Sequence, residues 1–229
     1  MKIQFLFLVS LMLGVVHLPC HSQEAKPSPT PPPMSSVQFI NATSISNIKL
    51  DIKDFHEYPK LAQGAKISGG HFPFTTWKLR AQKADGSDEK AIVEKTFQKS
   101  PSTASTVVII GNFEWKIEEE GKKKTLQAAM LNFDHELGAE DKPNSLTIVN
   151  GLVDKILRVS INAAEFEELP PMSHKTYRGL PAKTETIGIV GSKEMKLPIK
   201  FNAALDSGII AFYEKNGSVE FVASPQSRF

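Results

Sequence analysis

The chain contains an internal repeat, and this repeat limits the possible architectures more than any single motif does. Residues 37–52 read VQFINATSISNIKLDI, and residues 146–161 read LTIVNGLVDKILRVSI. Each copy opens with a short apolar run that ends at an asparagine, and these asparagines, Asn41 and Asn150, lie 109 positions apart. Each copy then alternates apolar and polar residues, with the apolar ones at Ile48, Leu50 and Ile52 and at Leu157, Val159 and Ile161. Because a fixed period indicates repeated structural units, the sequence predicts two modules and disfavours a one-site enzyme.

The N-terminal residues predict export. Met1-Lys2 and the apolar stretch 3–18 are typical of a secretory signal peptide, and Cys20-His21-Ser22 offers a cleavage site after Ser22. Two alternatives are a lipoprotein signal acylated at Cys20 and an uncleaved anchor, for which the stretch falls short of the roughly 20 apolar residues that span a bilayer. Residues 23–36, with five prolines from Pro27 to Pro33, predict a disordered linker or a semi-rigid spacer.

Loss of residues 1–22 would leave a nearly neutral chain without cysteine. One of the 27 basic residues is removed, which leaves 26 basic against 25 acidic residues, and the single cysteine is removed as well. This balance argues against a nucleic-acid partner and against stable membrane association after cleavage. A secreted chain without disulfides or a thiolate is typical of a bacterium, so we expect a secreted or periplasmic protein.

The remaining chain predicts two all-β modules, at residues 37–137 and 146–229, joined by a polar linker at 138–145. Short segments with period-two alternation and Gly, Pro or Asn punctuation are typical of β-sandwiches. In the first module the expected strands are 37–41, 48–53, 65–68, 76–82, 92–97, 106–110, 113–117 and 126–133, with Gly111-Asn112 separating the strands 106–110 and 113–117. In the second module the expected strands are 146–150, 156–162, 186–190, 195–201, 208–212 and 219–222. Residues 163–168 could form one or two helical turns. The run 106–110 is expected to be the most buried strand of the first module.

The predicted fold is therefore two tandem immunoglobulin-like antiparallel β-sandwich domains behind a signal peptide and a Pro-rich linker. In the alignment of the two modules, Leu169-Pro170 of the second takes the position of Tyr58-Pro59 in the first. Asn216-Gly217 predicts a type I′ hairpin turn.

The opening pattern of each module resembles the secreted bacterial β-sandwich repeats grouped as domain of unknown function 4397. The matching residues are 37–41 with 48–52 and 146–150 with 157–161, and residues 65–69 resemble that family's short strand before its second hairpin. The Ser-Pro after the family's first strand is absent, with Ala42-Thr43 and Gly151-Leu152 in its place, and the Ala-Gly before the central strand is missing. The family has no established activity, so the resemblance implies a tandem fold and an exported location but no mechanism.

Catalytic and metal-binding patterns are weak. The mature chain keeps four histidines, His56, His71, His135 and His174, and no serine stands in a G-x-S-x-G elbow. Asp134-His135-Glu136 has the residue types of a metal site, but neighbours on a strand point to opposite faces. The acidic residues around Gly86 (Asp85, Asp88 and Glu89) lack the spacing of a calcium loop. We predict no catalytic residues, no metal and no cofactor.

Phe72, Phe74 and Trp77 form the main aromatic concentration and are the candidate ligand-binding residues. Such side chains can stack on sugars or anchor a protein partner. Alternatively, Trp77 belongs to the core, since it shares a strand face with Leu79 and Ala81.

The expected function is that of a non-catalytic binding or cell-envelope interaction module with a protein or glycan as its partner. An assembly subunit that pairs through strand edges and a hydrolase with a dispersed site are the alternatives. A binding module would expose an aromatic patch, an assembly subunit would show long open edges, and a hydrolase would join titratable groups of both modules in one pocket.

Overall fold

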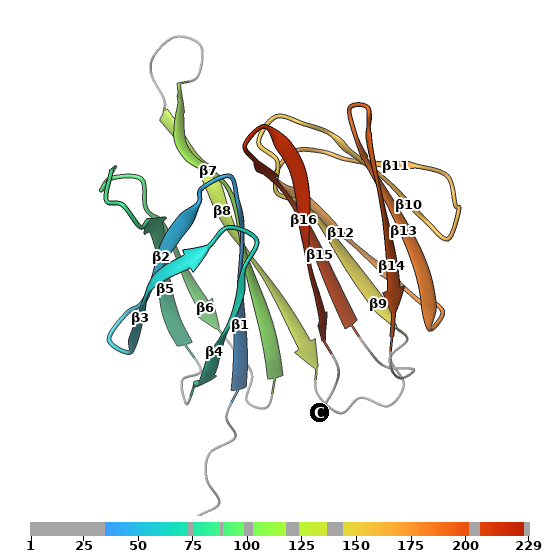
Figure 1. The fold of residues 1–229 in the computed structure, drawn as a ribbon. Coiled ribbons are helices and arrows are strands. Elements are labelled where there is room, and N and C mark those ends of the chain that lie inside the picture. The colour runs from blue at the N-terminus through green and yellow to red at the C-terminus, as the bar shows by residue number, and fades with distance from the viewer. Residues whose placement is uncertain are drawn as a thin grey trace, which may run out of the picture. The chain divides into compact units, whose positions relative to one another are not determined.

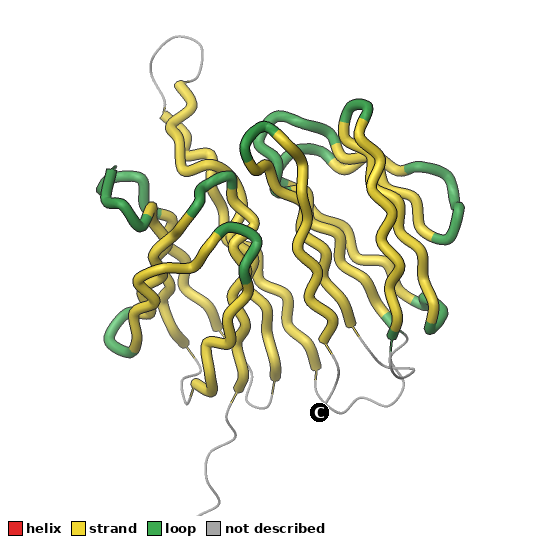
Figure 2. The backbone as a smooth tube through the Cα atoms, viewed as in Figure 1, coloured by secondary structure: helices red, strands yellow, loops and turns green. Residues whose placement is uncertain are grey.

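Strands make up all the regular secondary structure that is described. The computed structural model describes residues 35–72, 76–87, 89–98, 103–117, 124–136, 144–201 and 207–226. Within these ranges the chain forms sixteen strands and no helix (Figures 1 and 2). The described chain accordingly has no helix long and apolar enough to cross a membrane. The predicted signal peptide and most of the predicted Pro-rich linker lie outside the described residues.

The first sandwich consists of strands β1 to β8. Their bounds are β1 Ser35–Thr43, β2 Asn47–Ile52, β3 His56–Ala62, β4 Lys66–Phe72, β5 Thr76–Lys83, β6 Val93–Gln98, β7 Thr103–Ile117 and β8 Lys124–Glu136. One four-stranded sheet has the order β4-β1-β7-β8, and the other has the order β3-β2-β5-β6. All neighbours are antiparallel except β1 and β7, which run parallel.

The second sandwich, β9 to β16, repeats this topology strand for strand. Its strands are β9 Ser145–Asn150, β10 Leu157–Ile161, β11 Glu167–Leu169, β12 Ser173–Arg178, β13 Lys183–Val190, β14 Lys193–Lys200, β15 Ser207–Lys215 and β16 Ser218–Gln226. The sheet orders β12-β9-β15-β16 and β11-β10-β13-β14 equal those of the first sandwich, and β9 and β15 form the corresponding parallel pair. The predicted tandem β-sandwich fold is thus confirmed.

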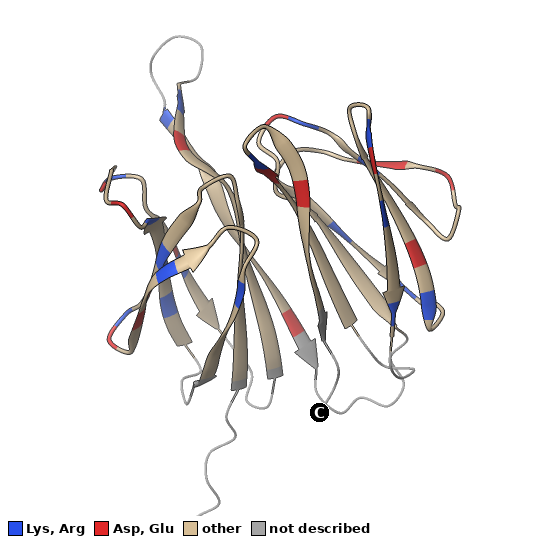
Figure 3. Cartoon of the chain, viewed as in Figure 1, with Lys and Arg blue, Asp and Glu red and all other residues tan. Residues whose placement is uncertain are grey.

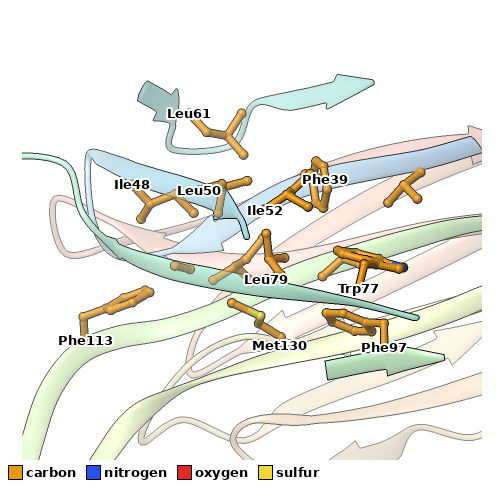
Figure 4. Close-up of a cluster of buried hydrophobic side chains, with 14 of the residues drawn as sticks. Phe39, Ile48, Leu50, Ile52, Leu61, Trp77, Leu79, Phe97, Phe113 and Met130 are labelled. Carbon is orange, nitrogen blue, oxygen red and sulfur yellow. The ribbon is translucent and has the colours of Figure 1, made fainter. Parts of the chain in front are cut away.

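Each sandwich has its own apolar core, and the repeated residues lie in it. Ile48, Leu50 and Ile52 of β2 pack in the first core with Phe39, Trp77 and Phe113, as Figure 4 shows. The equivalent residues of β10, Leu157, Val159 and Ile161, pack in the second core with Phe212. The alternation at Ile48 and at Leu157 was therefore interpreted correctly, because one face of each strand is covered by the opposite sheet.

A third apolar cluster, here called the junction core, joins the two sandwiches. Its buried residues come from β1, β7, β9, β15 and β16: Ile40, Ala42, Val108, Ile110, Val149, Ile209, Ala211, Tyr213 and Val222. The four strands of the two parallel pairs are therefore covered on both faces, which explains the unbroken apolar run at 107–110. Residues 33–229 consequently form one compact unit.

Pairing places Leu169 opposite Leu157 and Leu61 opposite Ile48. Leu169 is therefore the counterpart of Leu61, and the alignment of Leu169-Pro170 with Tyr58-Pro59 was wrong. The reason is that β3 has seven residues and a register shift, whereas β11 has three residues, so the prolines fall at different points.

Two further local predictions were wrong, and one is confirmed. Gly111-Asn112 does not separate two strands, because β7 continues through a bulge in which Gly111 and Phe113 have φ of 97° and 55°. The helical turns that 163–168 could have formed are absent: Asn162 and Ala163 have positive φ, which an α-helix excludes, and β11 follows. Asn216 and Gly217, with φ of 51° and 75°, form the predicted type I′ turn.

Candidate binding sites

The predicted aromatic site is not assembled by the described residues. Trp77 is only 5% exposed, and its ring stacks on Phe97 with a centroid distance of 4.4 Å. Phe39 approaches the same indole edge-on at 6.1 Å. Trp77 is thus a core residue, and naming it as a ligand contact was wrong, because the opposite sheet covers its face of β5. Phe74 lies outside the described residues, and of Phe72 only the backbone at the end of β4 is described.

The histidines and acidic residues singled out in the sequence do not gather in one site where their side chains are described; Asp88 and the side chains of His71, His135 and Glu136 lie outside the description. His56 packs edge-on against Tyr58 at 4.4 Å, and His174 against Phe133 at 5.1 Å. Asp134 accepts a hydrogen bond from Asn132 at 2.9 Å. In the described part of the chain no three His, Cys, Asp or Glu side chains lie close enough to hold a metal ion.

Charged side chains of both signs are interspersed over the described strands and turns (Figure 3). On the outer face of β5 and β6, for example, Glu94 pairs with Lys78 at 2.5 Å and with Arg80 at 3.3 Å. These contacts lower the pKa of the Glu94 carboxyl, mainly through the hydrogen bond from Lys78. Such solvated pairs neutralise the face on which they lie and contribute little to stability.

Asn41 and Asn150, the repeated asparagines, are fully buried and fix the loops at one end of the sandwiches. Asn41 Oδ1 accepts a hydrogen bond from Thr43 N at 3.1 Å, and its Nδ2 donates to the Leu61 carbonyl at 3.0 Å. Asn150 repeats both bonds, with Leu152 N at 3.2 Å and the Leu169 carbonyl at 3.0 Å. These residues have a structural role, and they orient the loops that follow β1 and β9.

Those two loops line a cleft at the edge of the junction core, here called the junction cleft. Its volume is about 310 Å³. The first sandwich contributes Ser44, the bulge residues Gly111 and Asn112, and Gln127 of β8, and the second contributes residues 151–154 and Glu214 of β15. The cleft is composite, because neither sandwich supplies all its walls.

The walls of the junction cleft are held by contacts between the sandwiches. Gln63 Nε2 donates to the Thr43 carbonyl at 2.8 Å and to the Glu214 carbonyl at 2.7 Å, which ties the loop after β3 to β15. A side chain at Gly151 has no room, since its Cβ would lie 2.8 Å from the Ala42 carbonyl oxygen and 2.7 Å from that of Phe212. Such tight backbone packing fixes the loop that carries Leu152 to Asp154.

An ion pair determines much of the charge at the cleft. Lys155 Nζ lies 2.5 Å from Glu214 Oε2. The hydrogen bond to Glu214 raises the pKa of the Lys155 ammonium, and Asp154 adds a smaller effect of the same sign. Of the lining side chains, the titratable ones are Asp154 and Glu214, and both belong to the second sandwich.

A second candidate site is the two-stranded ribbon formed by residues 112–117 of β7 and 124–127 of β8. β1 pairs with β7 only as far as Gly111, so β8 is the paired neighbour of β7 beyond that point. Figure 1 shows β7 and β8 continuing past the neighbouring strands. Trp115 is 41% exposed and Ile117 61%, and Trp115 lies opposite Leu126 on the same face of the ribbon.

No protein-family model matches the chain, and no curated protein matches it. The resemblance to domain of unknown function 4397 therefore stays a prediction.

Sequence reasoning missed both the cleft and the ribbon. The alternation of Phe113, Trp115 and Ile117 was recognised as a strand, but Phe113 is buried whereas the other two side chains are exposed. A pattern in one strand does not reveal where the covering sheet ends. The sequence signal was the apolar pair Trp115 and Ile117 after the buried run; in the structure it belongs to one strand, β7, which has fifteen residues against nine for its counterpart β15.

Proposed function

We propose that this chain is an exported, non-catalytic interaction protein of the cell envelope that binds a protein partner through the apolar face of the ribbon. The observation that carries the proposal is the exposure of Trp115 and Ile117 on one face of a projecting two-stranded element. Large apolar side chains kept in water at adjacent positions are typical of interaction surfaces, and Trp is enriched among residues that dominate binding.

Export is supported by the sequence alone. The signal-like segment before residue 23 and the loss of the single cysteine with it favour a periplasmic or secreted location. Cell fractionation with mass spectrometry of the mature N-terminus tests this part, and it distinguishes cleavage after Ser22 from acylation at Cys20.

Partner binding is tested by crosslinking in the producing cell. A photo-crosslinking amino acid replaces Ile117, and Trp115→Ser is combined with it. Phe55→Ser is the matched control, because Phe55 is an aromatic residue of the first sandwich with a similar exposed fraction, 46%. We expect a discrete crosslinked species that Trp115→Ser reduces at least five-fold and Phe55→Ser leaves unchanged. No discrete species, or an equal effect of both substitutions, would contradict the proposal.

The alternative of an assembly subunit is favoured by one observation. Residues 112–117 of β7 pair with β8 but not with β1, so one backbone edge of the ribbon is open to a further strand. Three other edge strands are protected: β3 contains Pro59, β14 contains Pro198, and β4 has a register shift where it pairs with β1. In the crosslinking experiment this alternative predicts a product of two copies of the chain in place of a second protein.

A further inference from the structure

Three polar side chains of the junction cleft have no partner in the described chain. They are the Ser44 hydroxyl, the Gln127 amide and the Asp154 carboxylate, which line the cleft without a hydrogen bond or ion pair to another described residue. The Asn112 side chain, by contrast, is engaged locally, since its Oδ1 accepts from Glu114 N at 3.0 Å. The cleft therefore offers a hydroxyl, an amide and a carboxylate to a ligand.

These three groups select for hydroxyl-bearing ligands. A ligand hydroxyl can donate to the Asp154 carboxylate or to the side-chain oxygen Oε1 of Gln127. It can accept from the side-chain NH₂ group of Gln127 or from the Ser44 hydroxyl. Lys155 is already paired with Glu214, so an anion would meet Asp154 without an available cation. Val153, which is half-buried, adds apolar surface against which C–H groups of a sugar ring can pack.

Size and rigidity agree with this chemistry. About 310 Å³ is at the lower end of the roughly 300–1,000 Å³ of ligand pockets, which suits a small ligand. Asn150 holds the loop of the second sandwich through Leu152 N and through the Lys155 carbonyl at 2.9 Å. Gly151 abuts the first sandwich, and Ser44 N donates to the Gly111 carbonyl at 2.9 Å. Walls fixed in advance reduce the entropy that binding costs.

We propose that the junction cleft is a binding site for a neutral, hydroxyl-rich ligand, namely one or two sugar rings of a glycan. The site is composite, with Ser44 and Gln127 from the first sandwich and Asp154 from the second. It is separate from the apolar face of the ribbon, because Gln127 follows Leu126 in β8 and successive residues of a strand face opposite sides. The duplication thus creates a site that a single module lacks.

The experiment uses the full mature chain and two-dimensional amide NMR. The probes are glucose, galactose, mannose, N-acetylglucosamine and the β-1,4-linked dimers of glucose and of N-acetylglucosamine, each at 10 mM. We expect at least one probe to shift the amide signals of Gly151, Leu152 and Asn112 with saturation. Gln127→Ala and Asp154→Asn are each expected to weaken the binding of that probe at least ten-fold. The matched control Gln98→Ala, at an exposed position of β6, is expected to leave the affinity for the probe unchanged.

Three outcomes overturn the proposal. The first is that no probe shifts the cleft signals, and the second is that a probe binds equally well to the Gln127 and Asp154 variants. The third is that calcium chloride shifts the same signals while no sugar does, which would make the site a cation site. Trp115→Ser is expected to leave sugar binding intact, so a failure of the ribbon proposal and a failure of this one are distinguishable.

Discussion

Asn41 and Asn150 occupy equivalent positions, and in both the side chain replaces backbone hydrogen bonds that the loop cannot form. Each amide bridges its own loop and the carbonyl of a leucine in the opposite sheet, Leu61 of β3 or Leu169 of β11. Both side chains are fully buried. A buried polar group without a partner costs about 1–3 kcal/mol, so these bonds matter more than exposed ones.

Asn41→Ala and Asn150→Ala are each expected to lower the free energy of unfolding by about 2–4 kcal/mol. Each substitution leaves a backbone N–H and a leucine carbonyl without the hydrogen bond that the asparagine side chain provides. Urea denaturation followed by circular dichroism measures the change. Gln98→Ala serves as the exposed control, with an expected change within about 0.5 kcal/mol. A loss below about 1 kcal/mol for both asparagines would show that water replaces the lost bonds.

At the scale of elements, β7 passes through two environments, a buried one and an exposed one. Its residues 107–110 are buried on both faces, Val107 and Ile109 in the first core and Val108 and Ile110 in the junction core. Beyond the bulge at Gly111 the strand leaves its neighbour β1 and becomes half of the ribbon. The bulge is therefore the point at which a core strand becomes an exposed one, as bulges often are.

Ile110→Ala is expected to destabilise the protein about as much as Ile109→Ala, by about 2–4 kcal/mol, because each removes a fully buried aliphatic group. An isolated first sandwich would predict a much smaller cost at Ile110, which faces away from its core. Urea unfolding of both variants decides between these cases, with Lys116→Ala on the exposed part of β7 as control. A cost below about 1 kcal/mol at Ile110 alone would exclude the junction core in solution.

A second element-scale feature ties β11 to β12 in the second sandwich. Glu167 Oε2 accepts hydrogen bonds from Lys175 Nζ at 2.6 Å and from Tyr177 Oη at 2.9 Å. Both bonds, that of Lys175 first, lower the pKa of the Glu167 carboxyl below its usual 4.5. Burial, followed by the bond to Glu167, raises the pKa of the Tyr177 phenol above its usual 10.0.

Because of these two pKa shifts, the free energy of unfolding is expected to fall at both the acidic and the alkaline end of the pH scale. The folded state favours ionised Glu167, so its contribution is present above pH 4.5 and is lost as the pH falls through the lowered value. It favours neutral Tyr177, so that contribution is lost as the pH rises above 10. Glu167→Gln is expected to reduce the decrease of the urea midpoint that occurs as the pH is lowered from 7 to 3. An unchanged decrease, or an equal effect of the neighbouring Glu168→Gln, would contradict this assignment.

At the scale of the whole molecule, the junction core joins the two sandwiches into one packed unit. Apolar residues from β1, β7, β9, β15 and β16 are buried only because both sandwiches are present. Polar contacts surround them, including the Gln63 bridge to Glu214 and a hydrogen bond from Ser224 to the Gln38 side chain. Separation of the sandwiches would expose this surface to water, which costs free energy in proportion to its area.

We therefore expect both sandwiches to unfold in one transition. Trp77 and Trp115 both lie in the first sandwich, so tryptophan fluorescence reports on that half, whereas circular dichroism reports on both. The two urea curves are expected to coincide in the wild-type chain. Gly151→Ala, whose new Cβ meets the Ala42 and Phe212 carbonyls, is expected to separate them.

Gly191→Ala is the control for that experiment, because its Cβ would meet nothing within 4 Å and only its φ of 59° opposes the change. Its fluorescence and circular dichroism curves are expected to remain coincident. Separate transitions in the wild-type chain would show that the sandwiches unfold independently.

The sequence by itself determined the all-β fold and its duplication, because period-two alternation at Ile48 to Ile52 and at Leu157 to Ile161 directly records burial on one sheet face. It also determined the turn at Asn216-Gly217, since positive φ at both residues favours those residue types. These properties are local, and each can be recognised from a few neighbouring residues.

Only the tertiary structure decided what covers the second face of β1, β7, β9 and β15, where Trp115 emerges from the core, and which loops meet at the junction cleft. Apolar runs such as 107–110 indicate burial on both faces but not the identity of the covering sheet. The cleft brings Ser44 together with Asp154 and Glu214, residues that lie far apart in the chain. Their proximity depends on how two complete sandwiches pack, which no local pattern in the sequence specifies.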